Sequence, residues 1–191
     1  KVQKIVGPGG PYVTAAKKLV YGEVDLDMVA GPSEIAILAD ETAVPAHVAA
    51  DLLSQLEHGT GHEKALLVTH SQAFAEAVCD EIVWQTPRLS RADTVERVLQ
   101  RQGILLAVVP DLKQGMELIN RFAPEHFEIL TRDARSWLND VRAAGAVFVG
   151  PWTPESAGDF VAGPSHVLPT GGAARMFNGL TADDFRRRHS F

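Results

Sequence analysis

Two titratable side chains, Glu125 and His126, stand next to each other between apolar residues in the segment Phe122–Phe127. Pro124 restricts the backbone of the residue before it, so the pair is expected at a junction between a helix and a strand. A carboxyl and an imidazole with different pKa values can serve two proton transfers in turn. The same pattern also fits a polar pair at the edge of a strand, and the residues alone favour neither interpretation.

A second pair, Gln55 and His58, is spaced by three residues near the end of a predicted helix, so the two side chains share one helix face. A neutral imidazole suits zinc, and an amide oxygen is an unusual but workable ligand. The alternative is a solvated histidine that complements the negative end of the helix dipole. Taken alone, the spacing favours this alternative.

Asp159 and His166 lie beyond Gly150, where glycine, proline and serine replace the regular apolar pattern. Long ordered loops inside compact domains usually carry function. Asp159 offers a hard oxygen ligand, and His166 offers an imidazole in the same region. Both are therefore candidate site residues.

Two turns could hold a ligand but lack a specific motif. The glycine-rich turn at 7–11 is followed by Tyr12, where a dinucleotide-binding G-x-G-x-x-G sequence needs its third glycine. Ser33 follows Gly31-Pro32 without the flanking glycines of a nucleophile elbow. Spacing alone therefore favours structural turns at both places.

The elements that must position these residues alternate between strand and helix patterns. The predicted strands are 2–6, 34–38, 65–69, 104–109, 127–130 and 146–149, and the predicted helices are 13–20, 45–58, 72–85, 91–102, 112–121 and 134–143. Ser71, Asp111 and Asp133 are predicted to cap three of the helices. This alternation predicts an α/β fold, an incomplete Rossmann-like parallel sheet with helices on both faces. Ligands of such sheets are expected beyond the carboxyl ends of the strands.

The chain divides into three predicted parts. Residues 1–32 form the end of a preceding α/β domain, 33–170 a Rossmann-like domain that carries the site, and 171–191 the start of a carboxyl-terminal extension. A strand pattern that starts at Lys1 suggests a piece of a longer protein, because real termini usually fray before the first element.

The composition excludes several classes of function. The chain has 191 residues, 46% of them hydrophobic, and a formal net charge of −6, which argues against nucleic-acid or anionic-membrane binding. Its one cysteine, Cys79, cannot form an intrachain disulfide, which favours a cytoplasmic location. The sequence contains neither an apolar run that could span a membrane nor a secretory signal pattern.

Together, the candidate segments resemble the histidinol dehydrogenase family. The resemblance rests on Lys4–Gly9, Asp27–Glu34, Asp51–Gly59, Ala123–His126, Pro154–Phe160 and His166–Thr170, which occur in the family's order along nearly the whole chain. It implies a zinc- and NAD-dependent enzyme that oxidises L-histidinol through the aldehyde to L-histidine, the last steps of histidine biosynthesis.

The resemblance also implies roles for individual residues. Glu125 and His126 match the catalytic acid–base pair. The implied zinc ligands are Gln55, His58 and Asp159. Substrate contacts are implied at Ser33, Gln55, His58, His126, Asp159 and His166. A homodimer is implied as well, in which the carboxyl-terminal tail of the partner subunit brings a histidine as the fourth zinc ligand.

The sequence departs from the family at two positions of the implied site. Gly10 occupies the cofactor-binding position where the family has an asparagine that contacts NAD, and glycine has no amide to offer. Phe160 stands where the family has a tyrosine after the zinc aspartate, so one hydroxyl contact is lost. Two alternatives remain open: a related zinc-dependent dehydrogenase for another polar alcohol, and a non-catalytic α/β module.

Overall fold

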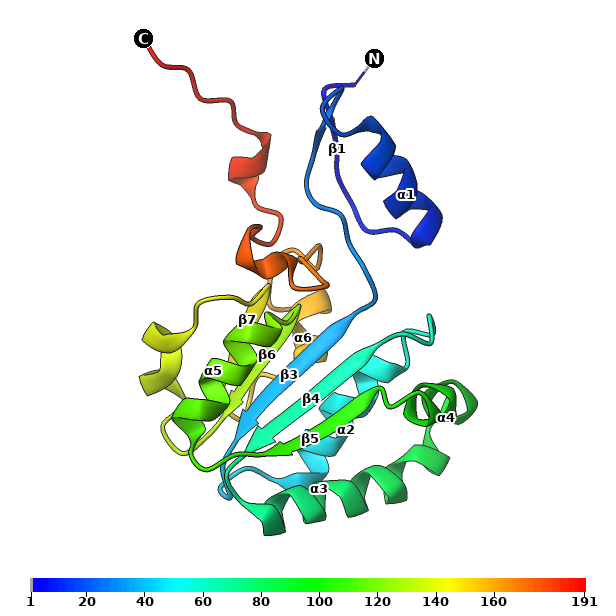
Figure 1. Cartoon of the computed structure of the whole chain (residues 1–191), viewed down its shortest axis with the longest axis vertical. Coiled ribbons are helices and arrows are strands. Elements are labelled where there is room, and N and C mark those ends of the chain that lie inside the picture. Colours follow the sequence, from blue (N-terminus) through cyan, green and yellow to red (C-terminus); the bar gives the residue numbers. More distant parts are fainter. Residues whose placement is uncertain (1) are drawn as a thin grey trace.

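The computed structural model describes residues 2–191, apart from the side chain of Asp159. Within this range the strands form two separate parallel sheets (Figure 1). The small sheet pairs β1 (Lys4–Ile5) with β2 (Asp25–Leu26), and helix α1 (Pro11–Val20) connects them. The large sheet holds the remaining strands in the order β5-β4-β3-β6-β7. No helix in the described part of the chain has the length and apolar character needed to cross a membrane.

The large sheet confirms the predicted Rossmann-like α/β fold. Its strands are β3 (Glu34–Ala39), β4 (Lys64–Thr69), β5 (Ile104–Val108), β6 (His126–Leu130) and β7 (Ala146–Val149), and all pairs are parallel. The chain winds outward from β3 to β5, returns to the other side of β3, and winds outward again to β7. Ile35 of β3 lies opposite His126 of β6, which fixes the register in the centre of the sheet.

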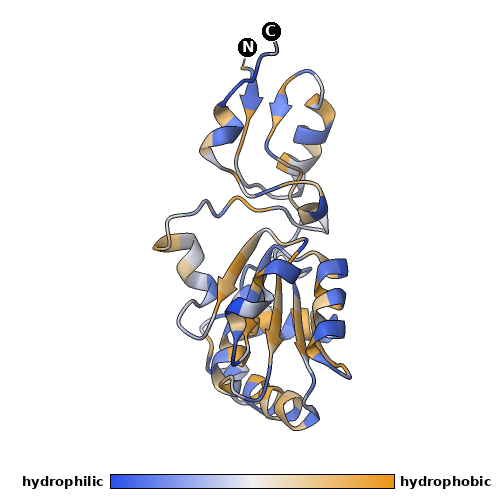
Figure 2. Ribbon diagram, turned by 90° about the vertical axis from the view of Figure 1, so that its left-hand side faces the viewer, coloured by the Kyte–Doolittle hydropathy of each residue, from blue (hydrophilic) through white to orange (hydrophobic). Residues whose placement is uncertain are grey.

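Helices cover both faces of the large sheet, because each strand alternates the direction of its side chains. On one face, α2 (Pro45–Leu56), α3 (Gln72–Gln85) and α4 (Ala92–Gln100) pack on a core that includes Ile35, Ile37 and Leu67. On the other face, α5 (Leu112–Phe122) packs on Leu38, Phe127 and Ile129. The strands of the large sheet, coloured mostly as hydrophobic, thus lie between helices that carry both hydrophobic and hydrophilic residues (Figure 2).

Two of the three predicted helix caps are confirmed. The side chain of Ser71 accepts a hydrogen bond from the backbone of Phe74, and that of Asp111 accepts one from Gln114. The third prediction is wrong: Asp133 makes no capping bond, and the segment after it is a 3-10 helix, η2 (Ala134–Asp140), not an α-helix to residue 143. The backbone of Asp133 lacks the fully extended conformation of the other two caps.

Two short elements were not predicted. Strand β2 has two residues, and helix α6 (Glu155–Phe160) has six residues with a glycine near its middle. Elements this short leave no periodic apolar pattern. The last residues, 171–191, form two 3-10 turns, η3 (Ala173–Arg175) and η4 (Ala182–Phe185), and return to the small sheet, where Lys4 donates a hydrogen bond to the carbonyl of Asp184.

A buried ion pair holds the glycine-rich turn between β1 and α1. Lys17 Nζ lies 2.7 Å from Oδ1 of Asp27 and donates to the carbonyl of Gly7 at 2.5 Å. The other carboxylate oxygen of Asp27 accepts the Gly7 N–H at 2.7 Å. Gly7 has φ +120°, a conformation that other residues rarely adopt. The turn is therefore fixed through both the N–H and the carbonyl of Gly7. It lies at the end of the small unit, formed by the small sheet and α1, that faces the large sheet (Figure 1).

Candidate active site

A glutamine and a histidine meet inside the molecule, between α2 and β6. Gln55 is fully buried near the end of α2, and His126 is 3% exposed at the start of β6. The side-chain oxygen of Gln55 lies 2.9 Å from Nδ1 of His126. Because an amide oxygen only accepts, Nδ1 carries the proton and Nε2 carries the lone pair. The contact thus leaves Nε2 as the basic nitrogen of the neutral ring.

The same contact belongs to a row of polar side chains, which we name the polar seam: Asp51 and Gln55 on α2, and His126 and Glu128 on β6. Residues four apart on a helix share a face, as do residues two apart on a strand. Phe127 points to the opposite face of the sheet, into the core beneath α5. The strand period therefore turns both polar residues of β6 toward α2.

His58 lies just past the end of α2, which stops at Leu56 and not at His58 as predicted. Its imidazole is exposed, and its Nδ1 lies 3.0 Å from the backbone carbonyl of Gln55 and 3.3 Å from the Gln55 side-chain nitrogen. Since a carbonyl only accepts, the shorter contact places the proton on Nδ1 and the lone pair on Nε2. This arrangement, in which a backbone carbonyl holds the other ring nitrogen, is typical of metal-ligating histidines.

Glu125 is buried beside His126, and its Oε2 lies 3.8 Å from the Nδ1 atom of that ring. Burial is the largest cause that raises the pKa of Glu125 to about 8. Hydrogen bonds from the Glu34 backbone and the Ser33 side chain lower the pKa, but by less than burial raises it. The charges of Glu34 and Glu155 raise the pKa further. Glu125 can therefore take up and return a proton near neutral pH. The hydrogen bond between the Ser33 side chain and Glu125 also places Ser33 beside the acid–base pair.

The structure adds a residue that sequence reasoning missed, Glu155 at the start of α6. It is 3% exposed, and its Oε1 lies 3.5 Å from Nε2 of His126. The segment Pro154–Phe160 was recognised as a candidate, but nothing in its local pattern distinguishes Glu155. Only the packing of α6 on the polar seam brings this carboxyl to the imidazole.

The remaining predicted residues are placed less directly. Asp159 follows Glu155 by one turn of α6, but its side chain lies outside the described part of the structure. His166 is exposed and lines the same cavity of about 1010 Å³ as His126, along β7. Gly10 caps α1 in the fixed glycine turn, and a Cβ added there would meet open space.

The expectation of a site at the carboxyl ends of the strands is wrong for these residues. Ser33 directly precedes β3, Glu125 directly precedes β6 and His126 begins it, so all three lie at the amino edge. Two strands that pair in parallel have their amino ends side by side at the same edge of the sheet. The pairing of β3 with β6 therefore brings the amino ends of these two strands together.

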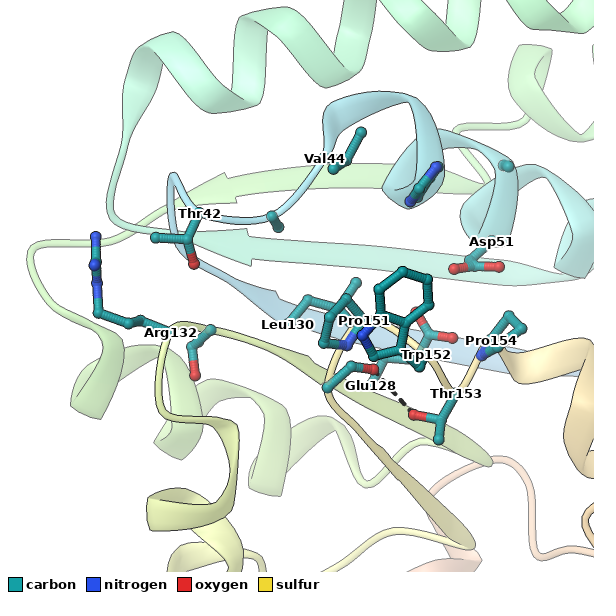
Figure 3. A pocket seen from close by; sticks show the side chains of 15 residues that line it. Thr42, Val44, Asp51, Glu128, Leu130, Arg132, Pro151, Trp152, Thr153 and Pro154 are labelled. Atoms are coloured by element: carbon teal, nitrogen blue, oxygen red, sulfur yellow. Dashed lines mark hydrogen bonds between the residues drawn. The ribbon is translucent and has the colours of Figure 1, made fainter.

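The carboxyl edge holds a different cavity, of about 640 Å³, at the point where the winding of the sheet reverses (Figure 3). Asp51 and Glu128 of the polar seam line it, together with Trp152, which is 90% exposed. Burial raises the pKa of both carboxyls, and the charge of Asp51 raises that of Glu128 further. The polar seam thus runs from this cavity to the acid–base pair.

The donors at the end of α2 fit a zinc ion in part. Among the side chains that the structure describes, no three of the types His, Cys, Asp and Glu are grouped to hold a metal. Gln55 and His58 are nevertheless neighbours: the Gln55 amide turns its nitrogen toward Nδ1 of His58 and its oxygen toward His126, while a backbone carbonyl fixes Nδ1 of His58. An amide oxygen and an imidazole nitrogen are both compatible with zinc.

Comparison with known proteins gives the family. The histidinol dehydrogenase family model matches residues 1–191. The chain is 51% identical over 189 residues to the histidinol dehydrogenase of Heliobacterium mobile, and 46% identical over 191 residues to that of Clostridium acetobutylicum, with 99% and 100% of this chain covered. A crystal structure of histidinol dehydrogenase from Elizabethkingia anophelis matches 96% of this chain with a TM-score of 0.91 and 37% identity.

The matched proteins are longer than this chain. It spans 44% of the length of each of the two curated relatives and 42% of the chain in the crystal structure. The family-model match nevertheless extends over every residue of the chain, including all the segments that form the buried site. The chain belongs to the histidinol dehydrogenase family.

Proposed function

We propose that this chain forms part of a zinc- and NAD-dependent dehydrogenase that oxidises L-histidinol through the aldehyde to L-histidine. The single observation that supports this most is the buried Glu125–His126 pair, which contacts the side chain of Gln55, the residue whose backbone carbonyl lies 3.0 Å from Nδ1 of His58. Two proton-transfer groups next to two potential metal donors suit an alcohol that is oxidised twice.

In the first oxidation His126 acts as the base. Its Nδ1 proton is held by the oxygen of Gln55, so Nε2 is the nitrogen that accepts the proton of the substrate hydroxyl. A base held in one orientation by its neighbours contributes about 10²–10⁴-fold to such a step.

In the second oxidation the aldehyde must gain a water molecule, and Glu125 acts as the base that activates the water. Its pKa of about 8 makes the carboxylate a stronger base than an exposed glutamate while keeping the proton exchangeable near neutral pH. The Ser33 hydroxyl and the Glu34 N–H orient this carboxyl.

Gln55, His58 and Asp159 are the residues of this chain that would hold the zinc ion, and His166 and Ser33 are proposed substrate contacts. When bound, zinc supplies orientation of the substrate, and NAD supplies the acceptor for its hydride. A histidine from the tail of the partner subunit is the proposed fourth zinc ligand, which requires a homodimer. A cytoplasmic location accords with the unpaired, exposed Cys79.

A second candidate is a related dehydrogenase that acts on another polar alcohol. Two observations favour it: Gly10 offers no side chain at the implied NAD contact, and Phe160, at 84% exposed, offers no hydroxyl near the proposed metal site. Both differences lie at positions that would touch cofactor or substrate.

The test is turnover by a zinc-loaded protein of the relatives' full length that contains this chain, followed as NADH absorbance, with L-histidinol and a panel of small amino alcohols. Reduction of NAD by L-histidinol supports the proposal. Turnover of another alcohol alone supports the second candidate. No zinc uptake and no turnover, with Gln55, His58 and Asp159 intact, would assign the chain to a non-catalytic α/β module.

A further inference from the structure

We infer that Glu155 is a positioning residue that holds the imidazole of His126 from the side opposite Gln55 and stabilises its charged form. The inference rests on the proposed role of His126 as the base. Glu155 belongs neither to the acid–base pair nor to the proposed zinc donors, and it begins α6, the helix that also carries Asp159.

The ring of His126 has a polar side chain beside each of its two nitrogens. The Gln55 oxygen lies 2.9 Å from Nδ1, and Oε1 of Glu155 lies 3.5 Å from Nε2. The side chains of His126 and Glu155 are only 3% and 4% exposed, so water screens their interaction little. The ring cannot turn over without losing the hydrogen bond between Nδ1 and Gln55, so Nε2 keeps one direction, toward Glu155.

Glu155 is itself fixed from two elements. The hydroxyl of Ser54, the residue before Gln55 on α2, lies 3.2 Å from Oε2 of Glu155 and 2.9 Å from the carbonyl of Asp51, so its single proton is shared between these two acceptors. The backbone N–H of Glu155 donates to Oε1 of Glu128 at 2.8 Å, and Glu128 is fully buried in the polar seam. Both carboxylate oxygens of Glu155 thus have a defined neighbour, one of them His126.

This placement suits the charge that develops in the first oxidation. The O–H bond of the alcohol breaks, an N–H bond forms at Nε2, and the carbon passes its hydride to the nicotinamide dinucleotide. The ring then carries a positive charge, which a buried carboxylate at 3.5 Å stabilises more than a neutral group would. The alcohol is oxidised, the dinucleotide is reduced, and Glu155 itself is unchanged.

The test compares Glu155→Gln, Glu155→Asp and Ser54→Ala with the control Glu96→Gln, a substitution of an exposed glutamate on α4. We expect Glu155→Gln to lower kcat about 10–100-fold with KM changed less than threefold, and Glu155→Asp to recover part of the loss. Ser54→Ala, which leaves the carboxylate in place, should give a smaller loss. Glu96→Gln should match the unsubstituted protein.

A second readout does not need turnover. Nitrogen NMR of the His126 ring, assigned with His126→Gln, should show the proton on Nδ1, and Glu155→Gln should shift the Nε2 resonance while Glu96→Gln does not. An unmoved Nε2 resonance together with unchanged kcat in Glu155→Gln would overturn the inference. Absence of turnover in the unsubstituted protein would instead overturn the proposed function, with the NMR contact still measurable.

Discussion

The side-chain oxygen of Gln55 and the Nδ1 atom of His126 are 2.9 Å apart in the buried interior between α2 and β6. A proposed metal ligand and the proposed base are therefore direct neighbours, although 71 residues separate them in the chain. Any change at Gln55 is expected to affect both functions, whereas changes at His58 and His126 should separate them.

His58→Ala and His126→Ala should have different effects. We expect His58→Ala to weaken zinc binding by more than the roughly 10–100-fold that is typical for residues that only support a ligand. His126→Ala should keep the zinc and lower turnover by about 10²–10⁴-fold, because it removes the base. Zinc content by elemental analysis and NADH formation measure the two effects. Equal zinc loss in both variants would contradict the separate roles.

Glu125 should make the protein less stable as the pH rises. Its pKa is about 8 in the folded state and near 4.5 in the unfolded state, so between these values the folded state binds more protons. The free energy of unfolding should therefore fall from pH 4.5 to 8, by about 5 kcal/mol from this group, and level off above pH 8.

Urea unfolding at pH 5, 6, 7 and 8.5 measures this dependence. Because the glutamine side chain does not titrate, Glu125→Gln should reduce the dependence of the free energy of unfolding on pH. Glu96→Gln should show the same dependence as the unsubstituted protein. Some slope should remain, because burial also raises the pKa of Glu34, Asp51 and Glu128. An identical slope in Glu125→Gln would show that Glu125 is ionised in the folded state at neutral pH.

Gly10→Asn should be tolerated and should strengthen NAD binding. A Cβ at Gly10 meets nothing within 4 Å, its φ is −69°, and an asparagine there can also cap α1, which has no side-chain cap. One added hydrogen bond predicts roughly tenfold tighter binding. Gly9→Asn is the matched control, because a Cβ at Gly9 would lie 2.4 Å from Val13 and should destabilise the turn. Fluorescence titration with NADH and thermal unfolding provide the readouts.

Lys17→Met should destabilise the small unit. It leaves the carboxylate of Asp27 buried without its cation, which typically costs about 3–5 kcal/mol. The exposed neighbour Lys18, changed to methionine, is the control and should cost little. Hydrogen exchange at Gly7, whose N–H the carboxylate of Asp27 accepts, should accelerate only in Lys17→Met. Equal exchange in both variants would mean that the ion pair does not hold the turn.

The order of residue types along the chain is enough to predict the main strands and helices and the segments that hold the chemistry. Apolar strands of four to six residues alternate with helices, two of which begin after the capping residues Ser71 and Asp111, and this local pattern was sufficient to predict the parallel sheet. It also selected Glu125 and His126, and the pair formed by Gln55 and His58, because these residue types and spacings carry their own chemistry.

How these segments meet depends on contacts that form in the folded molecule. The pairing of β3 with β6 brings Ser33 to Glu125 at the amino edge of the sheet, and a strand pattern contains no information on which strand will be its neighbour. The packing of α6 on the polar seam places Glu155 beside His126, and a six-residue helix leaves no periodic signal. Local patterns specify elements, whereas contacts between residues far apart in the chain depend on which buried faces pack together.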